Sequence, residues 1–301
     1  MKKVLIVVLV LIVCLAGWYA GSVADDYTSG GATITDAVEA FEIHWTSGSV
    51  TVAYHDADTV ILEETADRAI NGNDRMCWKM DGKKLVVEYN TPGFFDFLSF
   101  SKPSKALTVT LPKGIRLKQA DIIATSADII VPELTAEEVA LGSTSGDVKA
   151  EVTAPVVYGE STSGNVTLKV NGKAKNVKLG ATSGSLSLIL EEAEKADLGT
   201  TSGEVSLEAE NVKEARLGTT SGGIRVKVKT FGKMKIGATS GSVDAELSAE
   251  PGFTAEVSTT SGDFDSEMPL AKNGNTWSCG DGSAKLEIGV TSGNVKITEL
   301  K

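Results

Sequence analysis

The chain has 301 residues and a formal net charge of −11 at neutral pH, a balance that argues against binding to nucleic acid or to anionic membrane surfaces. Hydrophobic residues make up 42% of the chain, which suffices for one elongated domain or two compact ones and argues against disorder. With 31 glycines and 6% aromatic residues, the composition favours many tight corners over a core of large rings.

The chain begins with an apolar export segment. Two lysines precede an uncharged stretch at 4–20, which predicts that the N-terminus stays inside and that the rest is exported. This length suits either a long signal-peptide core or a short membrane anchor. We therefore expect a signal peptide or membrane anchor at 1–24, a linker at 25–31 and an extracytoplasmic domain, either tethered or secreted.

Three cysteines occur in the sequence. Lipid attachment at Cys14 is a weak alternative, because Val13 stands where such sites need a small residue. An oxidising compartment permits a disulfide between Cys77 and Cys279. In a stacked repeat, however, residues so far apart in sequence lie at opposite ends, beyond the Cα separation of about 7 Å that a disulfide can bridge.

Residues 32–115 predict irregular N-terminal β coils. In FEIHWTSGSVTVAYHD, apolar residues alternate on both sides of a Thr-Ser-Gly corner, with Phe41, Ile43 and Trp45 before it. We expect further strands at 60–64, 84–89 and 106–112.

A phenylalanine cluster lies between the last two of these strands. It consists of Phe94, Phe95, Phe97 and Phe100. If exposed, the rings form a contact patch for a partner or lipid; if folded inward, they plug the end of the apolar interior and block edge-to-edge aggregation. The cluster is the best single candidate for an interaction site.

Residues 116–301 contain a repeat of about 19 residues. Thr-Ser-Gly, or Thr-Ser-Ala in the first case, begins at Thr125, Thr144, Thr162, Thr182, Thr201, Thr220, Thr239, Thr260 and Thr291. Such a period indicates a solenoid of similar coils. Because each strand recurs in the same direction after a full coil, we expect a parallel stack.

The residues around each triplet alternate with period two, which predicts two strands that flank a corner. Glycine can adopt a positive φ there, and the Ser and Thr hydroxyls can bond the turn backbone. The helix-like run at 191–197 is too short to stand alone. The corner residues that we single out are Thr144, Ser145, Gly146, Thr182, Ser183, Gly184, Thr201, Ser202, Gly203, Thr220, Ser221 and Gly222.

These features resemble the bacterial putative-adhesin family of β-strand-repeat proteins, a domain of unknown function in envelope proteins. The matching features are the apolar N-terminus, DGKKLVVEY, LTVTLPKG, the serial TSGDV, TSGNV and TSGEV corners, and the closing KLEIGVTSGNVKI. The resemblance implies a β-helix-like fold at the cell envelope and an adhesive or scaffolding role. It supplies no catalytic residues.

Candidate chemistry is sparse. His55 with Asp56 and Asp58 could form a metal or acid–base site, but a solvated turn is the simpler interpretation, and His44 points outward between Ile43 and Trp45. No Ser/His/Asp set or zinc spacing can be assembled. We expect no cofactor.

Two columns of polar residues follow from the repeat. The residues after each triplet could bind Ca²⁺ or sugar hydroxyls, or could serve the corner backbone alone. They are Asp147, Asn165, Ser185, Glu204, Gly223, Ser242, Asp263 and Asn294. The Thr and Ser columns could form a hydroxyl array for ice or polysaccharide, but their place beside a glycine bend favours a corner role.

We therefore expect an all-β parallel solenoid at 32–301 that is not an enzyme and presents a repetitive face to a glycan or an envelope protein. Two alternatives remain open at this point. One is a β-helix polysaccharide-active enzyme. The other is an envelope-stress accessory protein that acts through a membrane partner and keeps an uncleaved anchor.

Overall fold

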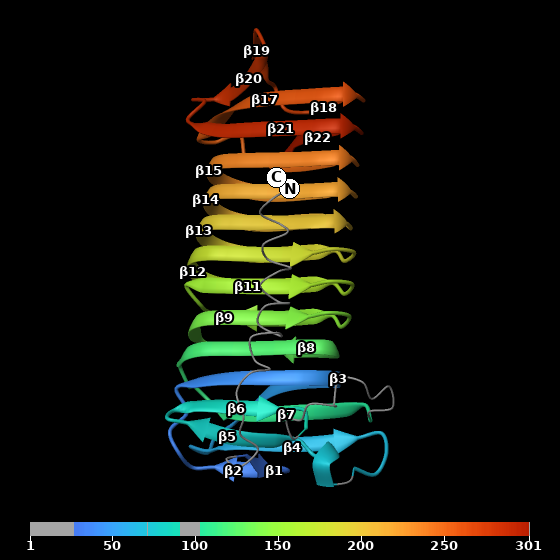
Figure 1. The fold of residues 1–301 in the computed structure, drawn as a ribbon. Helices are drawn as coiled ribbons and strands as arrows, with labels where there is room; N and C mark the ends of the chain where they lie inside the picture. Colours follow the sequence, from blue (N-terminus) through green and yellow to red (C-terminus); the bar gives the residue numbers. More distant parts are fainter. Residues whose placement is uncertain (1–26, 71, 91–102, 301) are drawn as a thin grey trace.

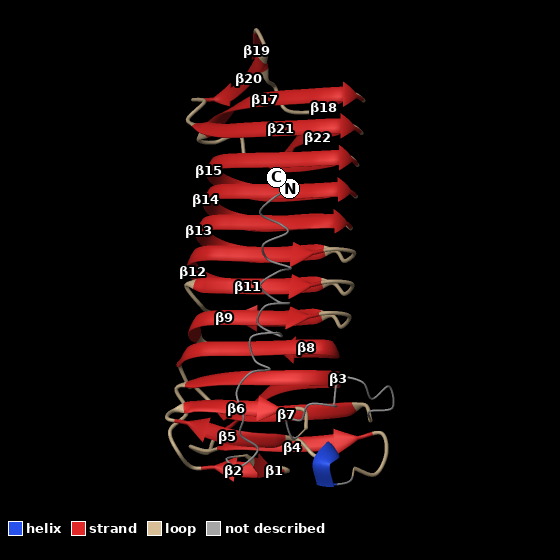
Figure 2. Ribbon diagram, viewed as in Figure 1, coloured by secondary structure: helices blue, strands red, loops and turns tan. Residues whose placement is uncertain are grey.

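Alternating apolar and polar residues produce long strands. Each long strand bends once, and successive strands stack as the coils of one solenoid (Figures 1 and 2). The computed structural model describes residues 27–70, 72–90 and 103–300. The segment expected to be a signal peptide or anchor and the cluster of Phe94, Phe95, Phe97 and Phe100 lie outside these residues. Within them, no helix is long and apolar enough to cross a bilayer. The described chain is all-β apart from a short 3₁₀ turn, η2, at Gly72–Asp74.

The regular body consists of coils that pair in parallel and in register. Its long strands are β12 (Val166–Ala181), β13 (Leu186–Ser202), β14 (Val205–Ser221) and β15 (Ile224–Ser240). Shorter strands make the coils below them: β8 (Leu117–Val131), β9 (Ala136–Ser143), β10 (Val148–Val152) and β11 (Val156–Ser161). All pairings among these eight strands are parallel, as the repeat predicts.

Each coil has two sheet-forming halves joined at the Thr-Ser-Gly corner. We call the half that ends at the triplet pre-corner and the half that follows it post-corner. In β14, for example, residues 205–209 are post-corner and residues 212–219 are pre-corner. The two halves form the two walls of the stack.

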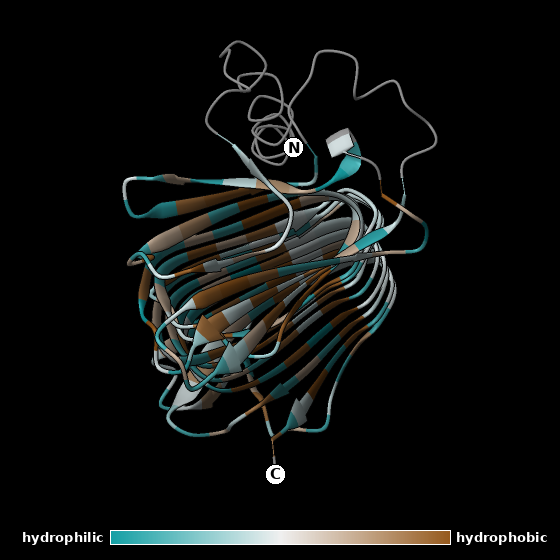
Figure 3. Cartoon of the chain, turned by 90° about the horizontal axis from the view of Figure 1, so that it is seen from below, coloured by the Kyte–Doolittle hydropathy of each residue, from teal (hydrophilic) through white to brown (hydrophobic). Residues whose placement is uncertain are grey.

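The interior is one continuous apolar core between these walls. Leu198, Leu217 and Ile236 stack in register on the pre-corner side and are at most 3% exposed. Seen from below, apolar and polar positions alternate along the strands (Figure 3). Complete burial of one such aliphatic side chain stabilises the fold by about 1.5–3 kcal/mol. Each coil therefore depends on its neighbours for a dry interior.

At both ends, the spatial order of coils departs from the order in sequence. The last coil in sequence consists of β21 (Ala284–Ser292) and β22 (Val295–Glu299). On one side it pairs with the coil of β15 and β16 (Val243–Leu247). On the other side it pairs with the coil of β17 (Gly252–Ser261) and β18 (Phe264–Ser266), which precedes it in sequence. At the other end, β3 (Ala40–His55) lies between β8 and the coil of β6 (Lys84–Glu88) and β7 (Lys105–Pro112). The expected solenoid of similar coils therefore does not keep the order of the sequence at its two ends.

The ends also contain antiparallel pairs, so the expectation of a purely parallel solenoid is wrong there. The remaining strands are β1 (Thr28–Ser29), β2 (Ala32–Ile34), β4 (Val60–Ala66), β5 (Cys77–Asp81), β19 (Ala271–Asn273) and β20 (Thr276–Gly280). They pair antiparallel as β1–β5, β2–β4, β4–β7, β5–β6, β17–β20 and β19–β20. Antiparallel partners thus cover one edge each of β6, β7 and β17, edges that could otherwise pair with other chains.

Cys77 and Cys279 lie at opposite ends of this stack, in β5 and β20 (Figure 1). Both are buried free thiols. Burial raises the pKa of Cys77 to about 12, so it stays a protonated thiol at neutral pH.

Candidate interaction surfaces

The Thr-Ser-Gly corners form one ridge along the stack. In the coil of β14 and in its neighbours, the serines of successive triplets pair in register, as Ser202 with Ser221 and Ser221 with Ser240. The Thr and Ser side chains singled out above are exposed, and the glycines between them are wholly or partly buried. Exposed members are Thr144, Ser145, Thr182, Ser183, Thr201, Ser202, Thr220 and Ser221.

Where the third residue of the triplet is glycine, the close approach of the neighbouring coil explains it. A Cβ atom on Gly146 would lie 2.0 Å from the carbonyl oxygen of Ala127, and one on Gly184 would lie 1.8 Å from that of Gly164. Neither of these two glycines has a positive φ, whereas Gly222 has φ 150°. The expected reason, a left-handed turn, is therefore incomplete. The common cause is that the neighbouring backbone leaves no room for a side chain.

The hydroxyl that bonds the corner backbone comes from the residue just before the triplet. Ser143 Oγ donates to Ala127 O at 3.0 Å and accepts from Gly146 N at 2.9 Å. Thr200 Oγ1 donates to Gly184 O at 3.0 Å. This corrects the expectation that the triplet's own hydroxyls do so. The buried hydroxyls at this position are Ser143, Ser161, Thr200 and Thr219.

In several coils, the polar residue after the triplet accepts a hydrogen bond from the backbone of the neighbouring coil. Asp147 N donates to Asp128 Oδ1 at 2.9 Å, and Asn165 N donates to Asp147 Oδ1 at 2.7 Å. The ladder continues, because Ser185 N donates to Asn165 Oδ1 at 3.0 Å. Side-chain oxygens of this column thus accept hydrogen bonds from backbone N–H groups. This supports a structural role for the column over a calcium or sugar site.

The pre-corner face carries a column of outward-facing glycines. Gly180, Gly199, Gly218, Gly237 and Gly289 pair in register across five neighbouring coils. Because side chains alternate along a strand, the triplet threonines two residues later lie on the same face. Two residues before the glycines lies a second column, of long and mostly charged side chains: Tyr158, Lys178, Asp197, Arg216, Lys235, Glu287 and Glu256.

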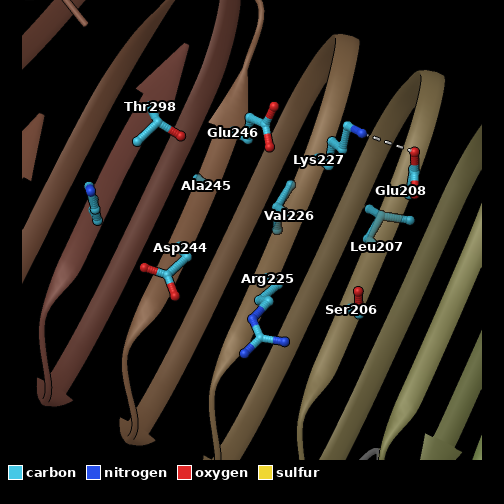
Figure 4. Close-up of a pocket in the computed structure, with 11 residues that line it drawn as sticks. Ser206, Leu207, Glu208, Arg225, Val226, Lys227, Asp244, Ala245, Glu246 and Thr298 are labelled. Atoms are coloured by element: carbon cyan, nitrogen blue, oxygen red, sulfur yellow. Dashed lines mark ion pairs between the residues drawn. The ribbon is translucent and has the colours of Figure 1, made fainter. Parts of the chain in front are cut away.

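The post-corner face carries charges that alternate from coil to coil. A shallow groove of about 280 Å³ lies on it (Figure 4). Its side chains include Arg225 and Lys227 on β15 and Asp244 and Glu246 on β16. Lys227 pairs with Glu208 across one coil at 3.4 Å. Because each basic strand lies beside an acidic one, the charges of this face neutralise one another.

A second groove, of about 490 Å³, lies at the bend opposite the triplets. Lys118, Arg116 and Lys173 supply its basic groups. Lys118 pairs with Glu39 at 2.6 Å, and Lys173 pairs with Glu192 at 2.8 Å. Most of its charge is therefore already compensated.

A partly buried charge cluster surrounds His44 near the N-terminal end. His44 Nδ1 lies 2.9 Å from Glu88 Oε1, His44 Nε2 lies 3.3 Å from Glu42 Oε1, and Lys84 Nζ lies 2.6 Å from Glu42 Oε2. Burial would lower the pKa of His44, but hydrogen bonds to both carboxylates raise it to about 9. The hydrogen bond from His44 lowers the pKa of Glu42 to about 2. Burial raises the pKa of Glu88 because it outweighs the attraction of His44.

Sequence reasoning missed this cluster, although it placed His44 on the outer face. The partners come from β3 and β6, the paired residues are 42 to 44 positions apart in sequence, and no motif joins them. Nearby on β8, burial raises the pKa of Asp121 to about 6, and the negative charge of Glu42 adds to the effect.

A fully buried lysine anchors the same end of the molecule. Lys105 is 1% exposed, and its Nζ lies 2.7 Å from Glu64 Oε1 and 2.7 Å from Asp74 O. It also donates to Tyr89 O and lies over the rings of Trp45 and Tyr89, with 5.1 Å and 3.8 Å to the ring centroids. Burial lowers the pKa of this lysine, and the hydrogen bond with Glu64 opposes that effect. The ion pair fixes β7 against β4 and β6.

The turn at His55 is structural. His55 Nε2 contacts Thr59 O at 2.6 Å, and Asp56 pairs with Lys113 at 2.8 Å. Asp58 is exposed. Within residues 27–70, 72–90 and 103–300, no group of three or more His, Cys, Asp or Glu side chains is arranged to hold a metal ion.

The comparisons with known proteins identify the family. The chain is similar to the crystal structures of a putative lipid binding protein from Parabacteroides distasonis (15% identity, TM-score 0.45, 92% of this chain and 98% of that one) and a putative adhesin from Bacteroides fragilis (11%, 0.40, 92% and 98%). A putative cell adhesion protein from Clostridium sporogenes matches at 10% identity and TM-score 0.22, over 91% of this chain and 100% of that one.

These structural similarities are too distant to carry an argument about function. No curated protein matches the chain. The model of the family described as Toastrack DUF4097 matches residues 38–298, which is nearly all of the β stack. As the resemblance drawn from its corners predicted, the chain belongs to a family of β-repeat proteins defined by a domain of unknown function, Toastrack DUF4097.

Proposed function

We propose that this protein is a non-catalytic binding or scaffold protein of the cell envelope, which presents a repetitive sheet face to a glycan or to another envelope protein. One observation carries the proposal: equivalent exposed side chains recur in register over many coils, as in the triplet serines and the charged columns. Such a surface offers the same contact at regular intervals, which suits multivalent binding of a polymeric or extended partner.

The apolar segment at 4–20 supports an envelope location, because it predicts export of the β stack. Several polar groups that could have been chemical sites have structural partners. The column after the triplets accepts backbone N–H groups, and His55 belongs to a turn. This distribution favours binding over catalysis.

Co-sedimentation of the purified full chain with isolated bacterial envelopes tests the proposal. We expect saturable binding that a heat-unfolded sample lacks. If the folded protein stays in the supernatant at every envelope concentration, the binding role is wrong. Release of soluble oligosaccharides from envelope polymers would instead favour the enzyme alternative.

The state of the N-terminus tests the tethered form of the proposal. Mass spectrometry of the protein recovered from its native envelope distinguishes a chain that begins at Met1 from one that begins at Asp25. An intact N-terminus supports an anchored protein and keeps the envelope-stress alternative open. A chain that begins at Asp25 supports a released protein.

A further inference from the structure

We infer that the pre-corner face between the coil of β12 and the coil of β21 is a docking surface for an extended anionic polysaccharide. The inference deepens the proposed function, on which it rests, by naming the face and the chemistry of the partner. Three observations support it: the charge of the face, its exposed hydroxyls and aromatic ring, and its bare backbone floor.

The charge of this face favours an anionic ligand. Lys233, Lys235 and Lys285 surround a single carboxylate, that of Glu287, with N–O distances of 3.7, 3.1 and 3.7 Å. Three ammonium groups thus share one counter-charge, whereas Arg216 in the neighbouring coil is paired with Glu214 at 2.7 Å. The post-corner face has no comparable excess, because its basic and acidic strands alternate. On a chain with a net charge of −11, this local excess of positive charge is complementary to an anion.

Hydroxyl groups lie on the same face as the charged cluster, and one aromatic ring lies at the far end of the charged column. Exposed triplet threonines, Thr201, Thr220 and Thr239 among them, lie on the same face and can donate to or accept from sugar hydroxyls. Tyr158, which is 38% exposed, extends the charged column by one coil beyond β12, because it lies on β11 next to Lys178. Its ring provides an apolar platform of the kind that sugar rings stack on.

The floor of the face, by which we mean the column Gly180, Gly199, Gly218, Gly237 and Gly289, exposes backbone without side chains. A Cβ atom on Gly199 or Gly237 would meet nothing within 4 Å, and one on Gly218 would meet only Gly237 O at 4.0 Å. None of these three has a positive φ. Neither the fold nor the turn therefore requires glycine here, although glycine within a strand is less favourable than alanine. A bare strand does, however, let a ligand approach the backbone closely.

The dimensions favour an extended chain over a compact ligand. Five glycine positions in neighbouring coils, about 4.8 Å apart, span about 19 Å. The threonine and charged columns run parallel to them along the stack. A linear polymer that lies along the stack axis contacts all three columns at once.

Affinity measurements with polygalacturonate, a linear polyanion, and dextran, a neutral glucan, test the inference. We expect the full chain to bind polygalacturonate, more weakly as salt rises, and to bind dextran at least roughly tenfold more weakly. The variant Gly218→Leu/Gly237→Leu fills open space on the floor and should reduce binding roughly tenfold. Lys233→Ala/Lys235→Ala should reduce it similarly.

A matched control lies on the post-corner face. The variant Ser206→Leu/Lys227→Ala makes equivalent changes there and should bind polygalacturonate as the original chain does. Circular dichroism melting curves of all variants identify any that unfold. Unchanged binding by the folded floor variant overturns the inference, as does equal affinity for dextran.

Two further outcomes separate this inference from the proposed function. If the chain sediments with envelopes but does not bind polygalacturonate, the inference fails and the proposed function stands. If it binds single-stranded DNA more tightly than polygalacturonate, and the lysine variants lose the DNA, the face is a nucleic-acid site and the inference is wrong.

Discussion

Two glycines four residues apart in the same coil should respond oppositely to one methyl group. In Gly222→Ala, the new Cβ would lie 2.0 Å from Gly203 O, far inside van der Waals contact, at φ 150°. To relieve the clash, the corner must separate from its neighbours. That strains the hydrogen bonds Gly203 N→Ser221 O and Gly222 N→Ser240 O, both 3.0 Å. Loss of two such bonds at about 1 kcal/mol each, with backbone strain of about 1–3 kcal/mol, predicts a destabilisation of about 3–5 kcal/mol.

Gly218→Ala is the matched control, since its Cβ enters open space. Here the lower backbone entropy of the unfolded chain should stabilise the protein by about 0.4–1 kcal/mol or leave it unchanged. Urea denaturation followed by circular dichroism measures both free energies of unfolding. If Gly222→Ala costs less than about 1 kcal/mol, or if the two variants are equally destabilised, the close-approach explanation of the corner glycine is refuted.

Three other predictions concern buried polar groups. Glu64→Gln should destabilise the fold by about 3–5 kcal/mol by leaving the Lys105 ammonium uncompensated, and a Lys105→Met/Glu64→Leu double variant should recover part of that loss in urea denaturation. His44 has a pKa of about 9 in the fold against 6.5 unfolded, so its stabilisation is complete below pH 6.5 and is lost as pH rises through 9. The free energy of unfolding should fall by about 2–3 kcal/mol over this interval, and His44→Gln should abolish the fall; a pH-independent original chain would contradict it. Ser143→Ala should cost about 1–3 kcal/mol by leaving two backbone groups unpaired, whereas the exposed Ser145→Ala should change stability by at most about 0.5 kcal/mol; equal effects of these two serine variants would argue against the buried-hydroxyl role.

The two glycine columns of the repeat have different surroundings. The triplet glycines lie where coils touch, and any side chain there would separate the coils. The second column lies on an open face, where the fold tolerates larger residues. Only the second column is therefore free to be shaped by a partner, which is why the docking proposal rests on that face.

The sequence also left several groups undetected. Lys105 directly precedes the strand expected at 106–112 and was not singled out, yet it is buried against Glu64, Trp45 and Tyr89. His44 was placed on the outer face, but its carboxylate partner Glu88 could not be inferred. These contacts join residues that are 16 to 60 positions apart in sequence, and no local sequence pattern predicts them.

From the sequence alone, the repeat and its alternation determined the all-β class, the corners and the inward-facing residues, because both are local properties that each coil expresses independently. Trp45, from the alternating segment before the first corner, is buried, and so are Leu217 and Ile236 at alternating positions of the repeat. Only the tertiary structure decided the order of coils at the two ends and the antiparallel strands found there. It also decided which glycines lie against a neighbouring backbone and which face open space. These depend on which strand edges meet and how closely, and that is set by packing between coils rather than by spacing along the chain.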